Sequence, residues 1–182
     1  MVIVFIGPGR FGSMAAYTPT GEVLVQQVPN SPAGMKRLLE QWLNTYGTVA
    51  PIIYFDEFYM LNSVKLDNHR IDMAEYGYKM GIYKGICYSY AEFLVPIEAR
   101  EMLLKDLGIA EEYDVGIQLE SIAYDVAAKA YPSIKKDIDS TGEMFFHLAP
   151  SLAILSKIMN GGLYPTESDS NIFRAPDSYI FD

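Results

Sequence analysis

The sequence has a single cysteine, Cys87, so no disulfide can form within the chain. Disulfide frameworks are typical of small secreted domains, and Cys87 lies in an apolar helical pattern where a buried, unreactive thiol is expected. The sequence also lacks a basic N-terminal region ahead of an apolar stretch, and no apolar run approaches the roughly 20 residues that cross a bilayer. We therefore expect a cytoplasmic protein without a membrane segment.

Basic residues are scarce. The chain has 14 Lys and Arg against 23 Asp and Glu, which gives a formal net charge of -9. Phosphate binding depends largely on Lys and Arg that release counterions, so this balance works against long-range attraction to DNA or RNA. No basic run is visible in the sequence, and the charge favours a protein as the main partner.

The chain has 182 residues, of which 50% are hydrophobic, enough for one domain with a substantial core. We find no internal repeat, no low-complexity tract and no linker before residue 160. The expected organisation is one domain over residues 1–159, followed by an acidic, aromatic and turn-like tail over residues 160–182.

Hydrophobic periodicity predicts the element order β-β-β-α-β-α-β-α-α-α. Ser31 and Pro32 are typical of a helix N-cap and first helical position. The expected strands cover residues 1–6, 13–17, 22–25, 50–55 and 91–95. The expected helices cover residues 31–46, 69–90, 96–107, 111–131 and 141–159.

The glycines at positions 7, 9 and 12 fit G-x-G-x-x-G behind a predicted strand. A dinucleotide-binding protein needs a helix directly after these glycines, because its N-terminal N–H groups bind the pyrophosphate. Here Pro19 and Gly21 interrupt such a helix, and Gln26 and Gln27 stand where the ribose-binding acid belongs. The pattern favours an antiparallel meander over a nucleotide site, so no nucleotide cofactor is expected.

The same stretch, FIGPGRFGSMAAYTPTGEVLV at residues 5–25, resembles the first motif and hairpin of another family. That family is the RuvC-like Holliday junction resolvases, bacterial and phage, of the RNase H-like superfamily. Gly7 stands at the position of the family's first acid. IIYFDEF at residues 52–58 resembles the second motif, with Asp56 or Glu57 at the position of its Glu.

Two later segments extend the resemblance to residues 2–158. YGYKMGIYKG at residues 76–85, followed by FLVP at residues 93–96, is similar to the family's glycine-bearing helix and its next strand. HLAPSLAIL at residues 147–155 resembles the last motif, with His147 retained and Pro150 in place of the final Asp. A Pro inside a helix costs about 3 kcal/mol, so we expect the last helix to start near Pro150 or to kink there.

The resemblance implies an α/β, RNase H-like fold, in which a three-strand antiparallel meander and parallel strands form a mixed sheet flanked by helices. Nucleases of this superfamily hold two divalent ions with clustered carboxylates, and Mg²⁺ prefers such oxygen ligands. Gly7 and Pro150 supply no carboxylate. The residual catalytic candidates are Asp56, Glu57 and His147, of which Asp56 and Glu57 are the candidate metal ligands.

The sequence therefore predicts a catalytically degenerate resolvase homologue of phage origin, which works in the bacterial host cytoplasm by binding and without a cofactor. The alternative is an active Mg²⁺-dependent endonuclease selective for branched DNA, with replacement acids from Asp137, Asp139 or Glu143. Those three positions fit helix capping and a solvated loop equally well. Asp56 and Glu57 could likewise serve as a backbone cap and a solvated charge, and His147 as a partly buried structural histidine.

Two features suggest partners. Gly77, Gly81 and Gly85 recur on one face of a predicted helix, which indicates either close packing on the protein's own sheet or a two-fold contact in a homodimer, as in the resolvase family. The tail carries acids together with Phe173, Tyr179, Ile180 and Phe181. This tail is expected either to dock on the protein's own surface or to bind a protein partner through residues 178–182.

Overall fold

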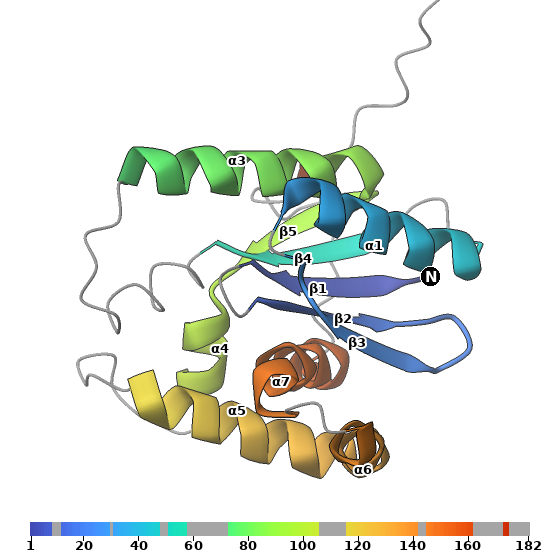
Figure 1. The fold of residues 1–182 in the computed structure, drawn as a ribbon, viewed down its shortest axis with the longest axis vertical. Helices are drawn as coiled ribbons and strands as arrows, with labels where there is room; N and C mark the ends of the chain where they lie inside the picture. The colour runs from blue at the N-terminus through green and yellow to red at the C-terminus, as the bar shows by residue number, and fades with distance from the viewer. Residues whose placement is uncertain are drawn as a thin grey trace, which may run out of the picture.

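A computed structural model describes residues 1–8, 12–29, 31–47, 51–57, 73–105, 116–141, 145–161 and 173–174. These residues form an α/β structure in which one mixed sheet lies between two helical layers (Figure 1). The sheet has the strand order β3-β2-β1-β4-β5-β6. Within the described parts of the chain, no helix is long and apolar enough to cross a membrane.

The first three strands form the predicted antiparallel meander. They are β1 (Ile3–Gly7), β2 (Ser13–Tyr17) and β3 (Val23–Gln27). β2 pairs antiparallel with both neighbours. Its first residue, Ser13, lies opposite Gly7 of β1 and opposite Gln27 of β3. Because a strand follows the glycine motif where a dinucleotide site needs a helix, the meander interpretation of this stretch is confirmed.

The next two strands are parallel to the first. β4 (Ile52–Asp56) pairs parallel with β1, and β5 (Phe93–Ile97) pairs parallel with β4. A short strand that the sequence did not predict, β6 (Phe173–Arg174), pairs antiparallel with the outer side of β5. Part of the C-terminal segment thus covers one sheet edge, while residues 175–182 lie outside the described residues.

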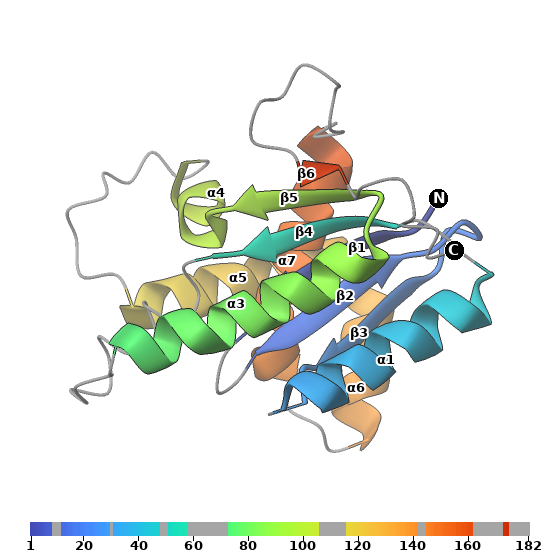
Figure 2. The same ribbon diagram turned by 90° about the horizontal axis from the view of Figure 1, so that it is seen from above.

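In the described parts of the chain, helices lie on both faces of the sheet (Figures 1 and 2). α1 (Pro32–Thr45) and α3 (Met73–Tyr90) form the first layer. The second layer contains four helices: α4 (Ala99–Lys105), α5 (Gly116–Ala130), α6 (Pro132–Thr141) and α7 (Phe145–Gly161). Because side chains alternate along a strand, Val4 and Ile6 of β1 face α1 and α3, whereas Ile3 and Phe5 face α7.

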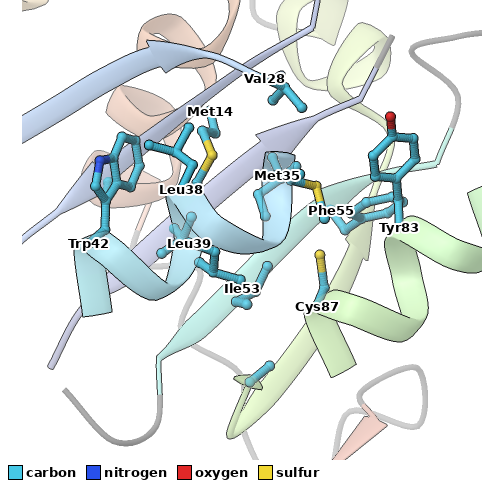
Figure 3. Close-up of a cluster of buried hydrophobic side chains, with 14 of the residues drawn as sticks. Met14, Val28, Met35, Leu38, Leu39, Trp42, Ile53, Phe55, Tyr83 and Cys87 are labelled. Carbon is cyan, nitrogen blue, oxygen red and sulfur yellow. The ribbon is translucent and has the colours of Figure 1, made fainter. Parts of the chain in front are cut away.

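The core under α1 and α3 is built from large apolar side chains (Figure 3). Met35, Leu39 and Trp42 follow one another on the buried side of α1, whose N-cap Ser31 accepts a hydrogen bond from the Gly34 backbone N–H as expected. Cys87 projects from α3 into this cluster and is fully buried (Figure 3). Its burial raises the pKa of the thiol to about 12.

Two predicted boundaries, the starts of β5 and of α4, were displaced. The Ala91 backbone N–H still bonds to the Cys87 carbonyl, so α3 occupies the chain up to Tyr90 and β5 begins two residues later than expected. Pro96 is paired with Phe55 inside β5, so it does not start a helix, and α4 begins at Ala99. At its other end α3 begins at Met73, and residues 69–72 lie outside the described residues.

The helices of the C-terminal half also differ from the prediction. α6 was not predicted, although Pro132 at its first position is a typical helix-starting signal. α7 begins at Phe145 and not at Thr141, which instead ends α6. Pro150 therefore lies inside α7, not at its start. The ring removes the bond to the Phe146 carbonyl near the N-terminal end of the helix, and burial of the surrounding apolar side chains outweighs that cost.

Candidate functional site

The candidate site lies at the carboxyl ends of β1 and β4, on the face of the sheet that α7 covers. The parallel pairing runs from Ile3↔Ile52 to Ile6↔Phe55, and Gly7 and Asp56 are the next residues on the two strands. Both share the face of their strands with residues of the α7 cluster, Phe5 on β1 and Tyr54 on β4. The structure therefore places Gly7 and Asp56 side by side.

The Asp56 side chain is buried, with 2% of its surface exposed. Its Oδ1 atom accepts a hydrogen bond from the Ala99 backbone N–H over 3.4 Å. This N–H belongs to the first turn of α4 and has no partner within the helix. Asp56 thus satisfies a backbone donor where the chain enters α4, which is the capping role that the sequence left open.

Glu57 lies on the opposite face of the sheet from Asp56. Its carboxylate forms an ion pair with the Nζ atom of Lys84 on α3, and its backbone N–H bonds to the Ile97 carbonyl over 3.3 Å. Glu57 directly follows β4, and its ion pair places its carboxylate on the α3 side of the sheet, whereas Asp56 shares its face with Tyr54 of the α7 cluster. Asp56 and Glu57 are therefore not brought together as paired ligands, and only Asp56 shares a face with Gly7.

No backbone constraint requires glycine at position 7. A Cβ atom added to Gly7 would lie 3.5 Å from the Phe5 ring and 3.6 Å from the Ser13 carbonyl oxygen, which are ordinary van der Waals distances. Gly7 also has no positive φ angle, unlike Gly21 and Gly47. The position can thus accept a Cβ atom without a clash.

A hydrogen bond between two serines connects β2 to α7 beside these residues. The Oγ atoms of Ser13 and Ser151 lie 2.6 Å apart, and each side chain is 1% exposed. Ser13 is the strand partner of Gly7, and Ser151 directly follows Pro150. The helix that would supply the last acid of a resolvase-like centre therefore contacts this part of the sheet through a neutral hydroxyl.

His147 lies in the first turn of α7, beside a group of aromatic rings. Its ring contacts that of Phe146 edge to face, with centroids 6.1 Å apart, and Phe146 is 39% exposed. Tyr124 of α5 packs against Phe145 with a centroid distance of 5.4 Å. The His147 side chain is partly buried, which agrees with a structural histidine.

The acids considered as replacements for the missing ligands do not gather at this site in the described structure. Asp137 is exposed on α6, and Asp139 forms an ion pair with Lys135 at 2.6 Å. Glu143 lies outside the described residues. Among the residues that the structure describes, no three His, Cys, Asp or Glu side chains lie close enough together to hold a metal ion.

Sequence reasoning did not single out Ser13 and Ser151. Their hydrogen bond joins residues 138 positions apart. Both serines lie within segments that resemble a family motif, but neither stands at the position of an expected acid. The one available signal was the small polar residue next to Pro150 in a largely apolar segment. A scan against protein-family models found no match for this sequence, and a search of curated proteins found none either.

Proposed function

We propose that this protein is an RNase H-like domain related to the RuvC-like resolvases, in which packing contacts occupy the place of the metal centre. It acts by binding, as a scaffold, and not by cleaving DNA. The order β3-β2-β1-β4-β5, with an antiparallel meander next to parallel strands, supports this proposal because the resemblance implies the same arrangement. The agreement of motif positions with strand ends adds to that support.

The observation that carries the proposal is the state of the three motif positions. Gly7 has no side chain, Asp56 is buried and bonded to the Ala99 N–H, and Pro150 precedes a serine that bonds to Ser13. A two-metal centre needs several carboxylates that converge on the ions. One buried carboxylate beside a hydroxyl pair is a poor ligand set for Mg²⁺, which requires near-octahedral oxygen coordination.

Titration with Mn²⁺, followed by electron paramagnetic resonance, tests this proposal directly. The wild-type protein is expected to bind no Mn²⁺ at this site, so its titration should match that of Asp56→Asn. Gly7→Asp combined with Pro150→Asp should create binding that a further Asp56→Asn substitution removes. Wild-type binding that Asp56→Asn abolishes would contradict the proposal.

An active, structure-selective endonuclease is the second candidate. One observation favours it: Asp56 lies next to Gly7, on the face that α7 covers, where a nuclease would hold its metal. That candidate requires further acids to reach Asp56 from outside the described residues, Glu143 among them. Cleavage of a four-way junction in Mg²⁺ or Mn²⁺ distinguishes it from the binding protein.

We further propose that Gly77, Gly81 and Gly85 form the contact face of a homodimer. All three are exposed on α3, and no other described atom lies within 4 Å of a Cβ atom added at any of them. Packing against the protein's own sheet therefore does not explain these glycines. Each costs about 1 kcal/mol of helix stability relative to Ala, which a close contact with a second copy would offset.

Light scattering at micromolar concentration tests the homodimer. The wild-type protein should be associated through this face, and Gly81→Leu should weaken that association because the leucine side chain separates the two helices. A wild-type monomer, with an unchanged mass in Gly81→Leu, would refute the proposed contact.

A further inference from the structure

The two edges of the sheet differ in whether another strand is paired with them. β6 pairs with the outer side of β5 and covers part of that edge. At the other end of the strand order, β3 pairs with β2 alone (Figure 2). No backbone hydrogen bond to the outer side of β3 is present among the described residues.

The hydrogen bonds between β2 and β3 show which backbone N–H and C=O groups of β3 point away from β2. Thr18 donates to the Glu22 carbonyl over 2.9 Å, and Val28 donates to the Gly12 carbonyl over 2.7 Å. Antiparallel pairs alternate between bonded and non-bonded types, so the even-numbered residues of β3 bond to β2. The N–H and C=O groups of Val23, Val25 and Gln27 consequently point away from β2, toward the open edge.

Among the residues that the structure describes, this edge lacks the features that normally prevent pairing with another chain. Exposed edge strands are usually protected by a charge, a proline, a bulge or a covering element. The β3 sequence, Val-Leu-Val-Gln-Gln, has no charged residue and no proline, and its five-residue register with β2 is continuous. The side chains of Val23 and Val25 are partly buried against the α7 cluster, whereas that of Gln27 is exposed.

We propose that β3 pairs antiparallel with β3 of a second copy, about a two-fold axis at Val25. In this register Val25 faces Val25 of the second copy, and Val23 faces Gln27 of the second copy. All three outward-facing residues then form bonded pairs, so every outward N–H and C=O group of the strand gains a partner. The two sheets become one continuous sheet across the interface.

Two properties of β3 favour a second copy as the occupant. Its outward-facing residues are spaced evenly on both sides of Val25, so the strand is complementary to itself, as an isologous contact requires. The pairing also brings no like charges opposite each other, although each copy carries a formal net charge of -9. This edge is separate from the glycine face of α3, and the two contacts are tested independently.

Charge substitutions test the register by sedimentation velocity at micromolar concentration. In Val25→Lys the new charge faces its own copy across the two-fold axis, so we expect the dissociation constant of this contact to rise by up to about five-fold. Gln27→Lys is the control, because it places the same charge on the same strand opposite Val23. Since Val25 is partly buried and Gln27 is exposed, the melting temperature of each variant is measured in parallel to separate association from folding. An equal effect of both substitutions, or a wild-type protein that shows no β3-dependent association, would overturn the proposal.

A proline variant separates pairing from folding. Val25→Pro removes an outward N–H and no bond to β2, so it should abolish the association and retain the folded structure. Gln26→Pro removes a bond within the hairpin and should lower the melting temperature more. Association that survives in a folded Val25→Pro protein would contradict the pairing.

Cysteine cross-linking provides an independent readout. Cys87 is the only native cysteine and is fully buried, so a thiol introduced at the partly exposed position 25 is the more accessible one. Val25→Cys should form a disulfide-linked dimer under mild oxidation, because residues directly opposite in a bonded pair lie about 5.5 Å apart at Cα. A Gly81→Cys dimer without a Val25→Cys dimer would support the α3 contact and overturn the β3 contact.

Discussion

The hydroxyl oxygens of Ser13 and Ser151 lie 2.6 Å apart in a buried contact between β2 and α7. Ser13 is the strand partner of Gly7, and Ser151 follows Pro150, so the bond joins the neighbours of the two positions that lack their expected acids. We interpret the contact as part of the structural core between β2 and α7.

Removing one of these serines should destabilise the protein. Ser151→Ala leaves the Ser13 hydroxyl buried without a partner, which should lower the free energy of unfolding by about 1–3 kcal/mol. The double variant Ser13→Ala and Ser151→Ala should cost less than the sum of the single variants, because no unpaired hydroxyl remains. Urea unfolding monitored by circular dichroism measures all three, and strict additivity would show that the two hydroxyls are not coupled.

Glycine-to-alanine substitutions on α3 and α1 should change the free energy of unfolding in opposite directions. Gly81→Ala should raise the free energy of unfolding of the monomer by about 0.5–1 kcal/mol, since a Cβ there meets no other described atom. Gly34→Ala is the control, because a Cβ at Gly34 would lie 2.5 Å from the Pro29 Cβ atom, and it should be destabilising. Urea unfolding at concentrations below the association range measures both. A loss of monomer stability in Gly81→Ala would indicate a packing role within the chain.

The Cys87 thiol should make stability dependent on alkaline pH. Burial raises the pKa of this thiol from 9.0 to about 12 in the folded protein. Below pH 9 the thiol is protonated in both states, and its contribution to the free energy of unfolding is fully present. As the pH rises from 9 toward 12, the thiol ionises only in the unfolded chain, so the free energy of unfolding decreases. The decrease approaches about 1.4 kcal/mol per pH unit.

The comparison of Cys87→Ala with the wild-type protein isolates this contribution. Tyr83, Tyr90 and Tyr131 also have raised pKa values, chiefly through burial, and they weaken both proteins equally at high pH. The stability advantage of the wild-type protein over Cys87→Ala should therefore shrink as the pH rises above 9. A constant difference in urea unfolding across that range would show that Cys87 does not titrate as expected.

Deletion of residues 170–182 should destabilise the sheet edge at β5. The deletion removes β6, whose Phe173 and Arg174 pair with Leu94 and Phe93. The melting temperature should fall by a few degrees, at about 4 °C or less per kcal/mol for a domain of this size. An unchanged melting temperature in differential scanning calorimetry would show that β6 contributes little and would favour recognition of a partner by this segment.

The sequence was sufficient to predict the meander, the parallel strand and the acids at its end. Strand formers between turn residues carry a strong local signal, and Asp56 follows such a run. The choice between Asp56 and Glu57 could not be made from the sequence, because a shift of one residue along a strand exchanges its two faces. In the structure, the pairing of β4 with β1 shows that Asp56 lies beside Gly7, and the ion pair with Lys84 shows that Glu57 faces α3.

The α-helical half was less predictable because its boundaries depend on tertiary packing. Pro150 suggested a helix start or kink, yet α7 begins five residues earlier, where buried Phe145 and Leu148 stabilise the first turn. The bond between Ser13 and Ser151 was also invisible, since a long-range pair of serines leaves no periodic pattern. The spacing of Gly77, Gly81 and Gly85 was visible in the sequence, but only the structure shows that this face of α3 is exposed.

Cleavage of an end-labelled four-way DNA junction in Mg²⁺ or Mn²⁺ tests the central claim most directly. If packing contacts have replaced the metal centre, the wild-type protein will leave the junction intact, as will Asp56→Asn. Metal-dependent cleavage by the wild-type protein that disappears in a folded Asp56→Asn variant would contradict this account and would show that the protein is a nuclease.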